Sequence, residues 1–340
     1  MAPIPNFRRL SLFLPGSVPP AAASSAAPLA SAPSTSRDPA GFGLAASAAA
    51  LARSLRPHQW LKNALVFLPV LTSHTYGDPG VLKAAAGLFL AWCLVASAGY
   101  LWNDLRDLES DRCIDPCFRR PLAAGRLRPW VAWSAMVPLA GAGLAVAHGI
   151  EARAALVLAA YALLSAFYSW RLKRVRGLDV ALLTAFYLLR TVSGGEATGN
   201  PVSPWLLAFS GCFFTGLALL KRTAQLRFCP ITLAEAGNRP HYLSADGPVL
   251  RASGIGAGAL AALVLSGYCD SSTAAGLYAL PAALWVLPVL LLLWQGRMWR
   301  AADEGKMTPD PLWFAVRDPV SWGVGAAAAA TVFVAVTGIA

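Results

Sequence analysis

The chain has 340 residues, of which 56% are hydrophobic and only 13% are charged, yet its formal net charge is +11. A soluble domain carries roughly 25% charged residues, so this composition argues against soluble globular domains and against a disordered chain. It also argues against a nucleic-acid-binding protein, because such proteins place their cations on a charge-rich surface. An apolar chain with excess cations instead predicts an integral membrane protein whose positive residues gather on one side.

The first 50 residues differ in composition from the rest of the chain. Ala, Ser and Pro supply 30 of them, and Asp38 is the only acidic residue. Such a segment buries too little apolar surface to offset the entropy of ordering it, which predicts a disordered tail over residues 1–50. Because the tail is Ser-rich, poor in acids and contains arginines, a transit peptide is the alternative interpretation. A single membrane domain is then expected over residues 55–340.

From residue 60 onward, long apolar stretches alternate with short polar ones. Most of them approach the ~20 residues that a helix needs to cross the hydrocarbon of a membrane, so the sequence predicts an all-α, polytopic membrane protein. Pro69 interrupts the first stretch, whereas prolines inside others are tolerated in membrane helices. The nine predicted membrane segments cover residues 61–76, 81–102, 130–148, 154–170, 179–197, 204–220, 252–269, 274–294 and 320–340.

The positive residues are distributed unevenly between the loops. Of the 28 lysines and arginines, 25 lie at or before the start of the first segment or in the polar connections 103–129, 171–178, 221–251 and 296–319. Because cytoplasmic loops are enriched in Lys and Arg, this asymmetry predicts that the N-terminus and these loops are cytoplasmic and that the C-terminus lies outside. The expected location is the inner, or plasma, membrane of the cell.

The strongest local signal is the run NDLRDLESDR at the polar end of the second predicted segment. If the helix continues through it, Asp104, Asp107 and Asp111 at positions i, i+3 and i+7 lie within about 60° of one helix face. Three carboxylates on one stripe repel one another unless cations share them, and hard oxygen ligands suit Mg²⁺ together with substrate phosphates. The pattern predicts a metal site, with a solvated helix end balanced by nearby arginines as the alternative.

Cationic residues follow the aspartates in the same loop. Arg119, Arg120 and Arg126 are candidates for binding a diphosphate, which needs a metal on one side and forked guanidinium donors on the other. The alternative is that these arginines only mark the cytoplasmic side. Cys113 and Cys117 are four residues apart, but no two further soft ligands accompany them in the sequence, so a zinc site is not predicted.

A second polar constellation surrounds the start of the fifth segment. Tyr168 and Lys173 precede Asp179, which opens an apolar run and is alternatively a helix N-cap. Arg190 lies eleven residues further, about 16 Å deeper at 1.5 Å per residue. Because a guanidinium inside a membrane is costly and usually faces a wet cavity, Arg190 is expected to line a cavity and contact an anion, with Glu196 as a candidate partner. A purely structural ion pair is the alternative.

Two further groups of charges lie on the same predicted side. Lys221 and Arg222 end the sixth segment. The last polar loop holds charges that either close over a head-group site or only solvate the loop. They are Asp303, Glu304, Lys306, Asp310, Arg317 and Asp318.

The nine segments and the N-D-x-x-D-x-x-x-D motif resemble the UbiA superfamily of intramembrane prenyltransferases. Within it, several stretches look closest to the branch that contains polyprenyl-phosphate phosphoribosyltransferases, and the resemblance covers roughly residues 55–340. The stretches are RPHQWLKN (residues 56–63), YSWRLKRVRGLD (168–179), LLRTVSGG (188–195) and ALLKRTAQL (218–226). KMTPDPLWFAVRD (306–318) is similar to a bacterial subgroup of the superfamily.

The resemblance implies a helical bundle around a central cavity that opens to the cytoplasmic side. It implies that Asp104, Asp107 and Asp111 hold Mg²⁺ against a diphosphate and that Asp179 serves the second polar cluster as a further catalytic residue. The substrate-binding residues that it implies are Arg56, Lys62, Asn63, Asn103, Arg120, Tyr168, Lys173, Arg190, Lys221 and Arg222.

Two positions differ from the family pattern. Superfamily prenyltransferases generally carry a second Asp-x-x-x-Asp, whereas Leu183 stands four residues after Asp179 here. This difference argues against a typical aromatic prenyltransferase and suits the phosphoribosyl branch. Residues 115–121 read DPCFRRP, without the lysine of the His-Pro-x-Lys-Arg-like stretch that the branch usually carries.

We therefore expect an Mg²⁺-dependent transferase that moves phosphoribose from phosphoribosyl diphosphate to a polyprenyl phosphate entering from the lipid. The alternative reverses the roles, with a prenyl diphosphate as the donor and an aromatic or other small acceptor. A transporter or lipid-binding protein is a third hypothesis, but transporters place ionisable residues near the midplane of the membrane, whereas here the acids gather at one face. No nucleic-acid partner is expected.

Overall fold

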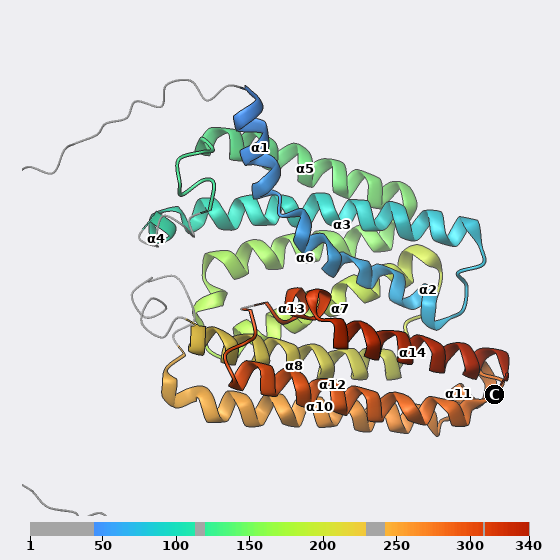
Figure 1. Ribbon diagram of the computed structural model, residues 1–340. Coiled ribbons are helices and arrows are strands. Elements are labelled where there is room, and N and C mark those ends of the chain that lie inside the picture. Colours follow the sequence, from blue (N-terminus) through green and yellow to red (C-terminus); the bar gives the residue numbers. More distant parts are fainter. Residues whose placement is uncertain (1–43, 113–119, 229–241, 309, 340) are drawn as a thin grey trace, which may run out of the picture. The chain divides into compact units, whose positions relative to one another are not determined.

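Every regular element in the part of the chain that the structure describes is a helix. The computed structural model describes residues 44–112, 120–228, 242–308 and 310–339. Figure 1 shows that its long helices lie side by side and run back and forth along a common direction. They are α3 (Pro79–Arg106), α5 (Pro129–Ile150), α6 (Ala152–Trp170), α7 (Leu178–Thr198), α8 (Pro204–Phe228), α10 (Gly247–Cys269), α12 (Val286–Asp303) and α14 (Pro319–Thr337).

Short helices connect or flank the long ones. The α-helical ones are α1 (Leu44–Ser54), α2 (Leu68–Thr72), α4 (Leu108–Arg112), α11 (Ser272–Leu277) and α13 (Pro311–Arg317). The 3₁₀ ones are η1 (Pro57–Phe67), η3 (Leu172–Arg174), η4 (Ser244–Asp246) and η5 (Pro281–Trp285).

Helix α1 covers the last part of the segment predicted as a disordered tail. Residues 44–50 are helical, whereas residues 1–43 lie outside the described residues. The physical reason is the Ala-rich sequence of α1, since Ala has the highest helix propensity, together with packing. Ala50 is buried in an apolar cluster with Leu101 and Leu122. The high Ala content, which contributed to the prediction of disorder, therefore favours a helix where the segment can pack against a neighbouring helix.

Seven of the predicted membrane segments are confirmed as helices that are long and apolar enough to cross a membrane. They correspond to α3, α5, α6, α8, η4 with α10, η5 with α12, and α14. The segment predicted at 274–294 is shifted to Pro281–Asp303, because its first residues belong to the separate short helix α11, which ends at Leu277. The segment predicted at 61–76 is instead built from the 3₁₀ helix η1 and the short helix α2. The segment predicted at 179–197 is the 21-residue helix α7, which contains the charged residues Asp179, Arg190 and Glu196.

Three helices begin with the same local device, an aspartate followed by proline. Asp78, Asp310 and Asp318 are the N-cap residues of α3, α13 and α14. Each carboxylate accepts hydrogen bonds from backbone N–H groups of the first turn, and the proline that follows has no N–H to satisfy. The sequence pair Asp-Pro therefore sets where each of these helices starts.

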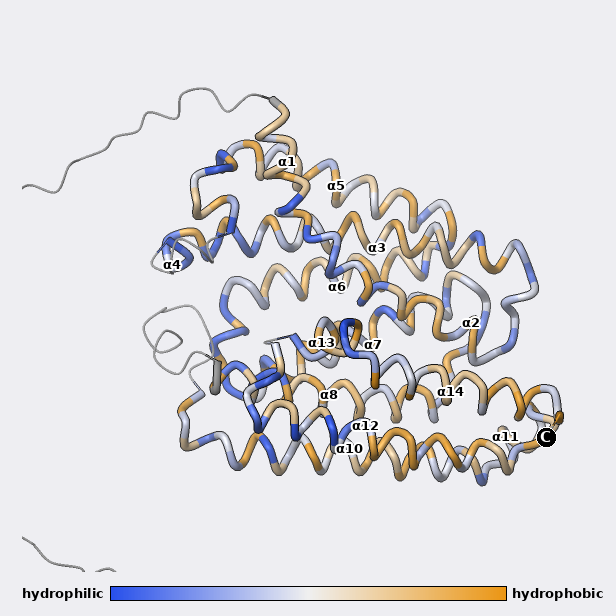
Figure 2. Tube along the Cα trace, viewed as in Figure 1, coloured by the Kyte–Doolittle hydropathy of each residue, from blue (hydrophilic) through white to orange (hydrophobic). Residues whose placement is uncertain are grey.

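The polar residues gather at one end of the helices. Figure 2 shows hydrophilic residues concentrated at the end where α4 lies, whereas the middle and the opposite end are mostly hydrophobic. Because the long helices alternate in direction, this end receives the C-termini of α3, α6, α8 and α12 and the N-termini of α5, α7 and α10. Charged residues that are far apart in the sequence therefore meet there.

Close approach of η1 to α7 holds the RPHQWLKN segment (residues 56–63) against the bundle. A Cβ atom on Gly194 of α7 would lie 2.2 Å from the carbonyl oxygen of Val66 in η1. At the residue before Gly194, the Trp92 indole of α3 donates a hydrogen bond of 2.7 Å to Ser193 Oγ. Only glycine allows this contact, because any side chain at Gly194 would overlap the backbone of η1.

We predict that Gly194→Ala destabilises the protein, because the added methyl group pushes η1 away from α7. Overpacking of a tight contact costs about 1–3 kcal/mol, and thermal unfolding of the purified protein in detergent measures it. Gly211→Ala in α8 is the matched control, since a Cβ there meets nothing within 4 Å. An equal loss of stability in the two variants would contradict the role of the η1–α7 contact.

Candidate active site

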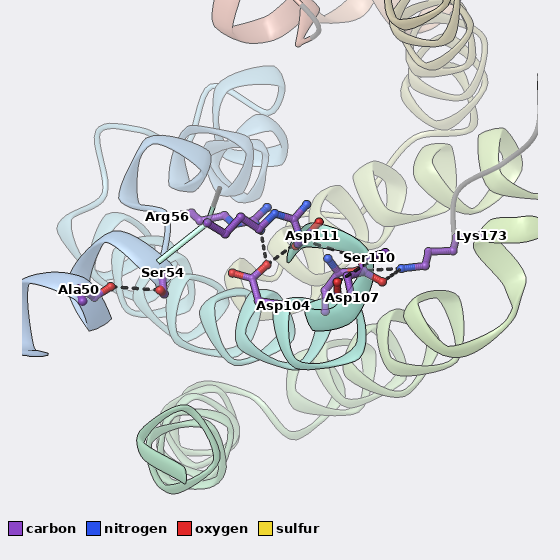
Figure 3. Close-up of polar contacts among 10 residues, drawn as sticks. Ala50, Ser54, Arg56, Asp104, Asp107, Ser110, Asp111 and Lys173 are labelled. Carbon is purple, nitrogen blue, oxygen red and sulfur yellow. Dashed lines mark hydrogen bonds and ion pairs between the residues drawn. The ribbon is translucent and has the colours of Figure 1, made fainter. Parts of the chain in front are cut away.

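The three aspartates of the stripe lie where α3 gives way to α4. Asp107 is the C-cap residue of α3, and α4 starts at the next residue. The backbone N–H of Asp111 donates to the carbonyl of Asp107 at 2.8 Å, and that of Asp107 donates to Asn103 at 2.9 Å. Helical spacing therefore continues through the junction, and the carboxylates of Asp104, Asp107 and Asp111 stay together (Figure 3). All three residues are buried.

Two arginines share the carboxylates of this stripe. Arg120 Nη1 lies 2.9 Å from Asp104 Oδ1 and 3.0 Å from Asp111 Oδ2, and it is 3.8 Å from Asp107 Oδ2. Arg56, which precedes η1, forms an ion pair with the same oxygen of Asp104. Cations from two separate segments thus relieve the repulsion that three aligned carboxylates would otherwise produce.

Lys173 in η3 supplies a third cation to the stripe. Its Nζ lies 2.5 Å from Asp107 Oδ1 and 3.4 Å from Asn103 Oδ1. Burial lowers the pKa of this lysine, while the neighbouring Asp107 carboxylate opposes that shift. The connection between α6 and α7 therefore contributes a buried ammonium group to the end of α3.

Arg56 reaches Asp104 from an unfavourable backbone conformation. Its φ of 54° lies in the left-handed region, which costs roughly 1–2 kcal/mol for a residue with a Cβ. The guanidinium lies over the Tyr100 ring at 5.2 Å. Burial and the nearby Arg120 lower the pKa of Arg56, whereas Asp104 raises it. Backbone strain of this kind is common at functional sites, where surrounding contacts maintain it.

The donor chemistry of the stripe fits a divalent cation. Asp104 Oδ2 is buried and has no hydrogen-bond partner among the described residues. Carboxylate oxygens are the ligands that Mg²⁺ uses in proteins, commonly with substrate phosphates in the remaining positions. Within the described ranges, no three His, Cys, Asp or Glu side chains are arranged to hold an ion by themselves. A phosphate-bearing substrate would therefore have to complete the ligand set.

A second cluster lies at the start of α7. Asp179 is 0% exposed, and its Oδ2 accepts a 2.6 Å hydrogen bond from Arg222 Nε of α8. Arg222 also donates to the Tyr168 hydroxyl at 3.3 Å. The predicted residues Tyr168, Asp179 and Arg222 are therefore in contact. The carboxylate of Asp179 is bound to the guanidinium of Arg222.

Tyr242 completes this second cluster, and it is a residue that the sequence analysis does not select. Its hydroxyl donates to Asp179 Oδ1 at 2.7 Å and accepts from the backbone N–H of Gly177 at 2.9 Å. Burial, together with the hydrogen bond to Asp179, raises the pKa of Tyr242 to about 12. Tyr242 lies 63 residues from Asp179 in the chain, so no local spacing could have linked the two.

A third polar contact joins η1 to the last polar loop, residues 296–319. Lys62 Nζ of η1 lies 2.7 Å from Asp310 Oδ2, and Gln59 Nε2 is 3.4 Å from the same oxygen. Burial alone would raise the pKa of Asp310, but the ammonium groups of Lys62 and Lys221 hold it at about 2. The last polar loop is therefore joined to η1 through Asp310.

Arg190 makes contacts that differ from the expected ones. It is 3% exposed, its Nε donates to Asn63 Oδ1 at 2.9 Å, and its guanidinium lies 4.6 Å and 4.8 Å from the ring centres of Trp92 and Tyr161. The candidate pairing with Glu196 is wrong, because Glu196 is exposed. Six positions at ~100° per residue place the two side chains about 120° apart around α7.

The structure brings most of the predicted residues into three contacts at one end of the bundle. The first holds Arg56, Asn103, Asp104, Asp107, Asp111, Arg120 and Lys173, the second Tyr168, Asp179 and Arg222, and the third Lys62. Asn63 and Arg190 form the deeper pair. Arg126 is exposed. Cys113, Cys117 and Arg119 lie outside the described residues.

Comparison with known proteins gives a family and several relatives. The model of the UbiA prenyltransferase family matches residues 64–315. The uncharacterized protein y4nM of Sinorhizobium fredii is 37% identical over 275 residues, which are 80% of this chain and 53% of that protein. Decaprenyl-phosphate phosphoribosyltransferase of Mycolicibacterium smegmatis is 35% identical over 194 residues, which are 54% of this chain and 59% of that protein. The chain therefore spans little more than half the length of these relatives.

Another relative and a solved structure match over more of their length. The nodulation protein NoeC of Azorhizobium caulinodans is 33% identical over 269 residues, which are 77% of this chain and 85% of that protein. The structure of a UbiA homolog from Archaeoglobus fulgidus bound to GPP and Mg²⁺ superimposes with a TM-score of 0.62 at 15% identity, covering 85% of this chain and 99% of that chain. The fold is therefore that of the UbiA homologs.

We predict that Asp179→Asn lowers stability by about 3–5 kcal/mol, because it leaves the buried Arg222 cation without its carboxylate. Thermal unfolding in detergent measures the loss, and Arg222→Met should give a loss of similar size. The double variant Asp179→Leu with Arg222→Met is expected to recover much of the stability, since an apolar pair leaves no unpaired charge. Additive losses would contradict a coupled pair.

Proposed function

Because this chain belongs to the UbiA prenyltransferase family, we propose that it is an Mg²⁺-dependent intramembrane transferase that moves phosphoribose from phosphoribosyl diphosphate to a polyprenyl phosphate. The observation that carries the proposal is the buried stripe of Asp104, Asp107 and Asp111, surrounded by cations from three segments at the polar end of the bundle. The similarity of the chain to decaprenyl-phosphate phosphoribosyltransferases supports the choice of donor and acceptor.

The proposed site combines metal-binding carboxylates with anion-binding cations. Asp104, Asp107 and Asp111 would hold Mg²⁺, and Asp104 Oδ2 is already buried without a hydrogen bond among the described residues. When bound, Mg²⁺ supplies positive charge that stabilises the pyrophosphate as it departs. Arg120 and Lys173 lie against the same carboxylates and would turn their N–H groups to the diphosphate oxygens.

The proposed reaction is a displacement at the anomeric carbon of the ribose. A phosphate oxygen of the polyprenyl phosphate forms the new bond, and the bond between the anomeric carbon and the diphosphate oxygen breaks, so that pyrophosphate leaves. The cations of the site would bind and orient both phosphate-bearing substrates, and the aspartates would hold the Mg²⁺ whose positive charge offsets the negative charge that develops on the leaving group. No side chain needs to become covalently attached to the sugar.

The proposed orientation places the polar end of the bundle in the cytoplasm. Positive residues dominate the connections at this end, and cytoplasmic loops are enriched in Lys and Arg. With η1 and α2 as one membrane segment and α7 as another, the chain would cross the plasma membrane nine times around a cavity open to the cytoplasm, and the C-terminus would lie outside. The polyprenyl phosphate would then enter sideways from the lipid.

We predict that Asp104→Asn and Asp107→Asn each reduce kcat by about 100-fold or more, because the lost ligands weaken metal binding by several kcal/mol. The rate of lipid-product formation in detergent is the measurement, and chelation of wild-type protein with EDTA should have the same effect. Asp246→Asn is the control, since Asp246 forms an ion pair with the half-exposed Arg176 at the same end. Full activity of the wild type in EDTA would contradict the metal role.

The identity of the donor is tested by labelling. Phosphoribosyl diphosphate with a radiolabelled ribose is expected to transfer its label to a polyprenyl phosphate, because the second Asp-x-x-x-Asp of aromatic prenyltransferases is replaced here by Asp179 and Leu183. A labelled prenyl diphosphate, offered with an aromatic acceptor in a parallel reaction, should give no labelled product. Label entering the product only from the prenyl diphosphate would support the alternative prenyltransferase instead.

A further inference from the structure

The two carboxylate oxygens of Asp310 have separate roles. Oδ1 caps α13 by accepting from the backbone N–H groups of Leu312 and Trp313, at 3.2 Å and 3.4 Å. Oδ2 accepts from Lys62 at 2.7 Å and from Gln59 at 3.4 Å. Because different oxygens make the two sets of contacts, the bond to Lys62 can be lost while the cap that starts α13 remains.

Helix α13 also lies against η1 through aromatic and apolar packing. The His58 ring of η1 packs edge-on against the Trp313 ring, with 5.6 Å between their centres. Leu312 and Phe314 pack, together with Leu65 of η1, against an apolar cluster at the end of α8. The anion at the start of α13 is therefore presented to Lys62 by a small helix that rests on side chains of two neighbouring elements.

Lys221 of α8 lies beside this ion pair without a partner of its own. It makes no hydrogen bond or ion pair with any residue that the structure describes, and the charged groups that act on it include Lys62, Arg222, Asp310 and Arg56. Three of these four neighbours are cations. The Asp310 carboxylate is therefore bound to the Lys62 ammonium group and also feels the charge of the Lys221 ammonium group, which leaves an excess of positive charge.

We propose that Asp310 is an internal anion that holds the place of the acceptor's phosphate on Lys62, and that this phosphate displaces it and binds between Lys62 and Lys221. Helix α13 is then a latch that the acceptor opens. The inference rests on the proposed function, because it assigns the two phosphate-bearing substrates to different cations. A phosphate monoester carries a charge of about −1.5 to −2 at pH 7, so it matches the two ammonium groups better than one carboxylate does.

The far end of α13 is held more firmly than the end that carries Asp310. Asp318, which follows α13, accepts two hydrogen bonds from Arg297 of α12, and one of them is 2.7 Å long. The same carboxylate caps α14 through the Ser321 N–H at 2.8 Å. Displacement of Asp310 from Lys62 would therefore swing the start of α13 about an anchored end, without disturbing α12 or α14.

The variant Asp310→Asn tests the contact with Lys62 separately from the capping of α13. Asparagine still caps α13 but carries no charge to compete for Lys62, so the KM for a polyprenyl phosphate should fall about fivefold, the size expected for one partly exposed ion pair. The KM for the donor should stay unchanged. Glu304→Gln is the matched control, because it removes a carboxylate that pairs with the exposed Lys306 instead. An unchanged or raised acceptor KM in the Asp310 variant would overturn the proposal.

A second measurement on the wild type does not depend on activity. Amide hydrogen exchange of residues 312–317 should become faster with farnesyl phosphate and stay unchanged with farnesol, and Lys62→Met should abolish the response. A response to inorganic diphosphate but not to farnesyl phosphate would assign the cations to the donor and overturn the proposal. No response to either would overturn it as well. If hydrogen exchange in α13 responds to farnesyl phosphate but the protein transfers no phosphoribose, the proposed function is overturned, whereas the displacement of Asp310 by a phosphate is retained.

Discussion

The buried carboxylate of Asp104 determines how the polar end of this bundle is built. It is 2% exposed and lies between the guanidinium groups of Arg56 and Arg120. Removing an ion from water costs several kcal/mol unless a partner and further hydrogen bonds compensate it. The chain therefore has to bring both arginines to the end of α3, and it tolerates a left-handed backbone at Arg56 to do so.

The same rule recurs at two further buried acids among the described residues of this end. Asp107 meets Lys173, Asp179 meets Arg222, and in each case the partner lies on a different element. These pairs tie α3 to η3 and α7 to α8, so that they set the spacing of the helices as well as neutralising charge. Such a network is also suited to phosphate chemistry, because each cation is already desolvated and can exchange a carboxylate oxygen for a phosphate oxygen.

The sequence predicted those features that depend on local spacing, and it missed those that depend on distant contacts. The helices and the single face shared by the aspartates follow from hydrophobic stretches and from the i, i+3, i+7 pattern, which survives the junction at Asp107. The contacts of Tyr242 with Asp179 and of Asp310 with Lys62 join residues 63 and 248 positions apart. The 3₁₀ geometry of η1 was missed because its apolar residues also suit a membrane helix.

Two contacts hold the segment that carries Lys62. Arg56, just before η1, is bound to Asp104, and Asn63 accepts a hydrogen bond from Arg190 inside the bundle. Arg190 has no carboxylate partner among the described residues, so aromatic faces and neutral oxygens compensate its charge, and it stays bound to η1. Since η1 is held at both points, the proposed binding of a phosphate at Lys62 would displace the opposing partner of Lys62 rather than η1. That partner is Asp310 at the start of the short helix α13, so the change proposed at the acceptor side of the site would fall on α13.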